Sequence, residues 1–321
     1  MKTFGQKLTV LLLKGIAYLP FWVLYALSDF FFVLIFHLVG YRKKVVYQNL
    51  RNSFPEKSAE EIDKIARKYY RHFCDLFMET AKFDRLSAKE LDKHIRYEHL
   101  ERLNDVFDQG KGMLLICFHY NNWEWNASMI QFLKHDFLMV FSPMKNNPSM
   151  ENYVTKMRTK FGALKVPMQN APRASFSLNQ GPNYGIMWLA ADQTPPAASQ
   201  YWTTFLNQET PFFSGPQKIA LKTNVPVFFH YIHKVKRGQY VVDFFEMTPH
   251  PVQDGEHAVL LDYVDIVEKL IQLRPEFWLW SHRRWKHKRS EGQELIPRNK
   301  TNRFDKQIDE MFERLNQIKS L

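Results

Sequence analysis

Residues 110–125 read GKGMLLICFHYNNWEW, and this stretch carries most of the information about the fold. An uninterrupted apolar run, 113–118, follows a glycine-rich turn and stops at His119. A short apolar run between turn residues is typical of a buried strand. Glu124 lies five positions beyond His119, between two tryptophans, in a segment whose pattern predicts a helix over 122–133.

Similar short apolar runs recur along the chain, bounded by Gly, Pro and Asn, at 137–142, 163–167, 185–191, 225–233 and 239–246. Helical patterns lie between several of them, at 148–160 and 215–223. This alternation predicts an α/β fold in which a mostly parallel central sheet is flanked by helices in αβα layers. Further helices are predicted at 58–80, where Ser58 and Glu61 have capping-box spacing, and at 255–273 and 304–318.

The N-terminal segment 8–41 is almost entirely apolar, with Lys14 and Asp29 as its only Lys, Arg, Asp or Glu residues. Its part 15–36 is long enough to cross a bilayer, although a carboxylate in hydrocarbon is costly unless it is paired or near an interface. We therefore predict an uncleaved membrane anchor over 1–44, either spanning or lying in the interface, and one folded domain over 45–321. A buried core helix is the alternative. A cleaved signal peptide is not expected, because the apolar region is too long.

The composition indicates anionic partners. The 321 residues carry a formal net charge of +11, and 15% of them are aromatic. A lipid surface, a phosphorylated substrate, an acidic carrier protein or nucleic acid would suit such a charge. No nucleic-acid recognition motif is present, so we do not expect nucleic-acid binding. The two cysteines, Cys74 and Cys117, are far apart, which indicates a reducing compartment and neither a disulfide framework nor a zinc cluster.

His119 and Glu124 are the candidate catalytic pair, since the sequence lacks G-x-S-x-G and H-E-x-x-H motifs and phosphate-binding loops. A residue at the C-terminal end of a strand lies where open α/β sheets bind ligands. Glu124, folding back, would hold one ring nitrogen of His119, so that the other takes a proton from an attacking hydroxyl. Such a pair allows transfer of an activated acyl group without a nucleophilic Ser or Cys. The alternative is a turn in which Asn121 or Asn122 caps a helix.

The residues around this pair resemble the H-x4-[D/E] block of the lysophospholipid acyltransferase superfamily. The chain is more closely similar to the bacterial late acyltransferases of lipid A biosynthesis. Four further blocks resemble that family in the same order: NNPSMENYVTKMRTKFGA (146–163), MWLAADQTP (187–195), PFFSGPQKIALKTNVPV (211–227) and RPEFWLWSHRRWK (274–286).

The resemblance implies roles for individual residues. His119 would be the general base and Glu124 its orienting carboxylate. The second block implies that Arg158 binds substrate, with its planar guanidinium paired to a phosphate. Asp192 and Gln193, which close an apolar run, are further substrate-binding candidates. Two more are Asn122, within the motif itself, and Arg283, in the basic run 282–289, where contact with anionic headgroups competes with simple solvation. No metal or organic cofactor is implied.

The function implied is transfer of a fatty acyl chain from an acyl carrier protein, or another acyl thioester, to a hydroxyl or hydroxyacyl group of a lipid A precursor. The expected partners are the acidic carrier, an anionic phosphorylated glycolipid and the membrane surface. The expected location is the bacterial inner membrane, with the catalytic domain facing the cytoplasm.

Two departures from the family pattern weaken the assignment of the acceptor: Asn121 replaces a frequent glycine, and FLN at 205–207 replaces Phe-Phe-Gly. Acylation of a phospholipid or an amino-acid lipid therefore stays open as an alternative. A lipase-like hydrolase and a non-catalytic adaptor that binds anionic lipid are the other rivals.

Overall fold

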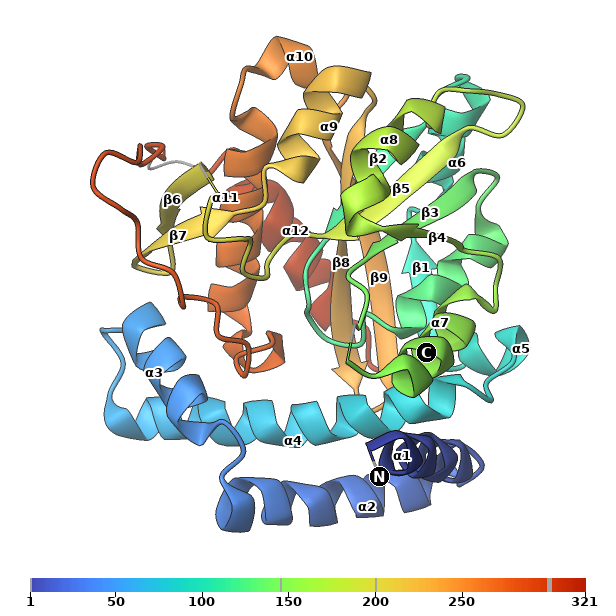
Figure 1. The fold of residues 1–321 in the computed structure, drawn as a ribbon, viewed down its shortest axis with the longest axis vertical. Coiled ribbons are helices and arrows are strands. Elements are labelled where there is room, and N and C mark those ends of the chain that lie inside the picture. Colours follow the sequence, from blue (N-terminus) through green and yellow to red (C-terminus); the bar gives the residue numbers. More distant parts are fainter. Residues whose placement is uncertain (1, 145, 200, 299–301) are drawn as a thin grey trace.

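The computed structural model describes residues 2–144, 146–199, 201–298 and 302–321. Its centre is a seven-stranded sheet with the strand order β1-β9-β8-β2-β5-β3-β4 (Figure 1). The strands are β1 (Ile95–Glu98), β2 (Met113–Cys117), β3 (Asp136–Phe141), β4 (Leu164–Pro167), β5 (Gly185–Ala190), β8 (Val227–Lys236) and β9 (Gln239–Thr248). All neighbours are parallel except β8 and β9, which form an antiparallel pair. The predicted α/β class with a mostly parallel sheet is confirmed.

Helices cover both faces of the sheet and one of its edges. The longer ones are α3 (Lys43–Ser53), α4 (Ala59–Phe83), α6 (Glu101–Asp108), α7 (Pro148–Thr159), α9 (Gly215–Thr223), α11 (Ala258–Leu273) and α12 (Asp305–Asn316). Shorter helical pieces are α5 (Ala88–Leu91), η3 (Met168–Asn170), α8 (Ala171–Ala174), η4 (Ser175–Ser177), α10 (Pro251–Asp254) and η5 (Pro275–Phe277). Both predicted capping-box residues cap α4: Ser58 Oγ accepts from the Glu61 amide at 3.2 Å.

The alternation of side chains along β2 divides the core into two layers. Leu114 and Ile116 pack in a cluster that includes residues of α4, α9, α11 and α12. Met113, Leu115 and Cys117 point to the opposite face, into a cluster with residues of α6 and α7. All five are buried, as expected for a strand covered on both faces. The sheet is therefore the middle layer of an αβα arrangement.

The structure differs from the sequence-based prediction in four places. The edge strand β1 was missed, and so was the antiparallel hairpin of β6 (Tyr201–Phe205) and β7 (Gln208–Phe212). The helix predicted at 122–133 is a 3₁₀ helix, η2 (Trp125–Phe132). The predicted span 15–36 is interrupted: α1 (Lys2–Ala17) ends before Pro20, and α2 (Phe21–Val33) begins after it and continues into the π-helical η1 (Leu34–Val39). Proline explains the break, because it lacks the amide hydrogen that a continuous helix needs.

Among the described residues, one segment, Phe21–Val39, is long and apolar enough to cross a membrane. It overlaps the predicted segment 15–36 but begins and ends later in the chain. It lies along α4 (Figure 1).

Candidate active site

Two neighbouring parallel strands bring His119 and Asp192 together. Cys117, the last residue of β2, is paired with Ala190, the last residue of β5. His119 and Asp192 each follow two residues later, so both emerge at the C-terminal edge of the sheet. This is the edge at which open α/β sheets bind ligands. The sequence-based prediction placed each residue at a strand end, and the register makes them neighbours.

Asp192 is held by three hydrogen bonds. Its Oδ1 lies 2.7 Å from His119 Nδ1, and its Oδ2 accepts from the His119 amide at 3.1 Å and from Trp278 Nε1 at 2.9 Å. Its side chain is only 2% exposed. Burial raises the pKa of Asp192, but the electrostatic interaction with His119 and the hydrogen bonds from His119 and Trp278 outweigh burial and lower it overall. An ionised Asp192 fixes the proton of a neutral His119 on Nδ1 and leaves Nε2 as the basic nitrogen.

Gln193 and Trp123 complete the surroundings of the His119 ring. The Gln193 amide Nε2 lies 3.1 Å from His119 Nε2, in the position from which it can donate. The Trp123 ring stands edge-on to the imidazole, with the centroids 5.2 Å apart. Side-chain exposure of His119 is 22%, so a reactant can reach Nε2 from the adjoining cavity.

Glu124 does not make the contact that the sequence predicted for it. Its carboxylate forms an ion pair with the Arg158 guanidinium, in which Arg158 Nε donates to Oε2 at 2.8 Å and Nη2 donates to Oε1. Trp123 Nε1 also donates to Oε1, at 3.2 Å. Burial raises the pKa of Glu124, but Arg158, Trp123 and His119 together lower it. The carboxylate bound to His119 Nδ1 is Asp192, and Glu124 instead holds a cation that α7 supplies.

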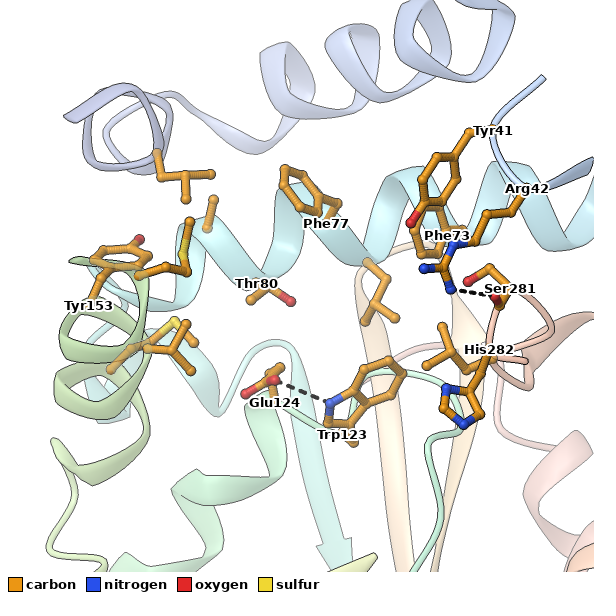
Figure 2. A pocket seen from close by; sticks show the side chains of 17 residues that line it. Tyr41, Arg42, Phe73, Phe77, Thr80, Trp123, Glu124, Tyr153, Ser281 and His282 are labelled. Carbon is orange, nitrogen blue, oxygen red and sulfur yellow. Dashed lines mark hydrogen bonds between the residues drawn. The ribbon is translucent and has the colours of Figure 1, made fainter. Parts of the chain in front are cut away.

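Two cavities meet at Trp123 and Glu124. The first, of about 440 Å³, is lined by His119, Glu124, Arg158 and Gln193, and otherwise mainly by apolar side chains of the sheet edge and helices α8 and α9. The second, of about 400 Å³, lies between α4 and the 123–124 turn, with α1 and α7 at its sides. Figure 2 shows Trp123 and Glu124 facing Phe73, Phe77 and Thr80 of α4 across this second cavity.

Asn122 makes two hydrogen bonds within the protein. It is fully buried, its Nδ2 donates to Glu79 Oε2 at 2.8 Å, and its Oδ1 accepts from the Trp125 amide at 3.2 Å. The second bond satisfies the amide of Trp125, the first residue of η2, although the N-cap residue of this helix is Glu124. The binding of substrate by Asn122 stays a prediction. Asn121 has φ +50, a left-handed conformation that glycine or asparagine adopts most readily.

The sequence profile of the bacterial lipid A biosynthesis acyltransferase family matches residues 1–287. The chain belongs to this family. It is 25% identical to the lipid A biosynthesis lauroyltransferase of Escherichia coli K12 over 84% of this chain and 87% of that protein. It is 22% identical to the lipid A biosynthesis palmitoleoyltransferase of the same strain over 76% and 79% of the two chains. A lipid A biosynthesis acyltransferase of Haemophilus influenzae is 22% identical over 86% of both chains. The protein is therefore an O-acyltransferase.

The closing block of this acyltransferase contributes residues that the sequence analysis did not place in the site. Trp278 donates to Asp192. Of the two adjacent arginines, Arg283 is exposed, whereas Arg284 is buried and its Nη2 donates to the Pro211 carbonyl at 2.6 Å. Burial lowers the pKa of Arg284 to about 10. The RPEFWLWSHRRWK block was the available signal, but it does not show which arginine points inward.

Proposed function

We propose that this acyltransferase moves a fatty acyl chain from the thioester of an acyl carrier protein to a hydroxyl or hydroxyacyl group of a lipid A precursor. The observation that carries the proposal is His119 at the mouth of an apolar cavity, with its Nδ1 held by Asp192. The names of the relatives, a lauroyltransferase and a palmitoleoyltransferase, support a fatty acyl donor.

In the proposed reaction, His119 Nε2 removes the proton of the acceptor hydroxyl while the hydroxyl oxygen attacks the thioester carbonyl. The tetrahedral intermediate collapses, the carbon–sulfur bond breaks, and the thiolate takes the proton back from His119. Asp192 holds the proton of the neutral imidazole on Nδ1, so that Nε2 faces the acceptor, and it stabilises the imidazolium afterwards. We assign to Asp192 the orienting role that the sequence suggested for Glu124. The Gln193 amide must yield its place at Nε2 to the acceptor hydroxyl.

Glu124 and Arg158 are proposed to shape the site as a unit. Their two bonds use Nε and Nη2 of the guanidinium, and an arginine has five N–H donors in all. The donors on Nη1 remain for an anionic group of the acceptor in the cavity that Arg158 lines. Glu124 belongs to the catalytic set as the residue that positions Arg158. Exposed Arg283 is proposed to contact the phosphorylated headgroup.

We further propose that residues 1–44 attach the enzyme to the inner membrane and that residues 45–321 form the catalytic domain on the cytoplasmic side. Acyl carrier protein as donor is supported by the net charge of +11, which suits an acidic protein, and by the reducing compartment that two free, buried cysteines indicate.

Mass spectrometry of lipid A tests the proposal. Cells lacking the gene should produce lipid A with one acyl chain fewer. Wild type should restore this chain and His119→Ala should not. His250→Ala is a matched control, because its side chain is exposed and lines neither cavity beside Glu124. Unchanged lipid A in the deletion strain, with no compensating paralogue, would contradict the lipid A assignment and direct the search to phospholipid and amino-acid lipid acceptors.

A further inference from the structure

The helices α1 and α2 each expose a stripe of large apolar side chains. On α1 the stripe holds Phe4, Leu8, Leu11 and Leu12, with Phe4 74% exposed. On α2 it holds Trp22, Phe30 and Val33, with Trp22 75% exposed, and it continues into Leu38 and Val39 of η1. These nine residues form what we call the N-terminal apolar face. So many large apolar side chains on one surface are characteristic of a contact with another molecule or a membrane.

The opposite side of α2 is tied to the catalytic domain by polar contacts as well as apolar ones. Ser28 Oγ donates to Asp75 Oδ1 at 2.7 Å, and both residues are buried. The Tyr25 hydroxyl donates to Glu79 Oε1 at 3.0 Å. Asp75 and Glu79 belong to α4, so these bonds fix one side of α2 along that helix. Figure 1 shows α2 lying lengthwise beside α4.

Arg237, in the turn between β8 and β9, neutralises the one carboxylate of the apolar segment. Its Nη2 donates to Asp29 Oδ1 at 2.8 Å and its Nη1 donates to Asp29 Oδ2 at 3.1 Å. Its Nη2 also donates to Asp75 Oδ1 at 2.6 Å. Asp29, which looked costly in a membrane segment, is therefore a binding point for the sheet of the catalytic domain. An α2 that crossed a bilayer would leave Asp29 unpaired in hydrocarbon.

The helix α1 is fixed on the same side as the catalytic domain. Leu13 packs in a small cluster with Ala81 of α4 and Tyr153 of α7. Lys82 Nζ donates to the carbonyls of Ala17 and Leu19, at 3.0 and 2.9 Å. These contacts hold the chain just before α2 against the domain that follows α2. A helix whose two ends are both held in this way cannot pass to the other side of a membrane.

The charges around the N-terminal apolar face suit an anionic lipid surface. Residues 1–44 contain six Lys or Arg residues and a single carboxylate, Asp29. Just after α4, the Arg85 guanidinium lies 4.1 Å from the ring centre of Tyr18, and Arg71, within α4, lies 5.0 Å from that of Phe32. Long cationic side chains near an apolar surface place their charges at the headgroup level.

We propose that α1, α2 and η1 lie flat in one leaflet of an anionic phospholipid bilayer and do not cross it. The inference rests on the proposed membrane attachment and specifies its geometry. Leu13 and Phe77, which line the cavity of about 400 Å³ beside Glu124, come from α1 and α4. Phe77 is itself 55% exposed. The flat arrangement therefore lets a lipid chain reach Glu124 without leaving the leaflet.

Protease protection of the full-length chain with a peptide tag at each end tests the geometry. In inverted inner-membrane vesicles both tags should be digested, and in intact spheroplasts both should be protected. Digestion of only the C-terminal tag in inverted vesicles would show that α2 crosses the membrane and would overturn the inference. Acyl transfer measured in the same vesicles separates the two proposals, because an inactive protein with both tags on one side would contradict the function alone.

Vesicle binding tests the surface itself. Leu11→Glu combined with Phe30→Glu should reduce the partitioning of the purified full-length protein onto vesicles of phosphatidylglycerol and phosphatidylethanolamine by about tenfold or more. Val252→Glu is the matched control, since Val252 is 54% exposed and belongs to α10, at the end of the molecule opposite α2 (Figure 1). Equal partitioning of the double variant and wild type would overturn the proposed face.

Discussion

Two buried carboxylates meet at this active site, and they serve different partners. Asp192, two residues beyond β5, holds His119, whereas Glu124, five residues from His119 in sequence, holds Arg158. Asp192 is fixed by the strand register, and Glu124 faces the last turn of α7. Proximity in sequence therefore identified residues of the site but did not predict which carboxylate contacts His119. That contact depends on which strands are neighbours in the sheet.

Removal of His119 should have the largest effect, because its imidazole is the proposed general base. We expect His119→Ala to lower kcat for acyl transfer by about 10²–10⁴-fold, the usual contribution of a general base. The measurement is transfer from acyl carrier protein to a purified lipid A precursor. If His119→Ala retained more than a third of wild-type kcat, His119 would not be the general base.

Arg158 tests the second pair. Arg158→Lys keeps a positive charge but loses the planar two-point contact with Glu124. We expect KM for the phosphorylated acceptor to rise about tenfold, with a smaller change in kcat, since the fork-like geometry contributes to binding more than to proton transfer. Initial rates over a range of acceptor concentrations measure both constants. A fall in kcat with unchanged KM would instead place Arg158 with His119.

The stability coupling between Glu124 and Arg158 should be measurable by a double-mutant cycle. Glu124→Gln and Arg158→Met each leave a largely buried partner without its counter-charge, while the double variant leaves neither. The expected coupling energy is about 1–3 kcal/mol in urea unfolding, in the range found for residues in contact. Additive effects of the two substitutions would show that the pair contributes nothing to folding.

The smallest effect concerns pH. The pKa of Asp192 in the folded protein lies below its ordinary value of 3.8. Its ionisation therefore stabilises the fold fully above that value, and this contribution is lost as the pH falls through the lower folded pKa. The difference in unfolding free energy between wild type and Asp192→Asn should accordingly narrow below about pH 4. A difference that stayed constant down to pH 3 would contradict the lowered pKa.

Much of the fold was readable from sequence because buried parallel strands are apolar runs, as in MLLIC of β2 and GIMWLA of β5. The edge strand β1, IRYE, was not readable, since an edge strand needs no such run. Pro20 marks the break between α1 and α2 in the sequence, but the nearly continuous apolar composition led to the prediction of one uninterrupted segment over 15–36. The residues of the site were found by motif, whereas the His119–Asp192 contact depends on strand register, which one sequence does not reveal.

The most direct test compares kcat of Asp192→Asn and Glu124→Gln in acyl transfer to a purified lipid A precursor. We predict that Asp192→Asn lowers kcat by about 10²-fold or more, because His119 loses the group that fixes its tautomer. We predict a smaller loss for Glu124→Gln, expressed mainly as a higher KM. The reverse order, with Asp192→Asn close to wild type and Glu124→Gln inactive, would contradict the proposal that Asp192 orients His119. It would show that Glu124 has this role.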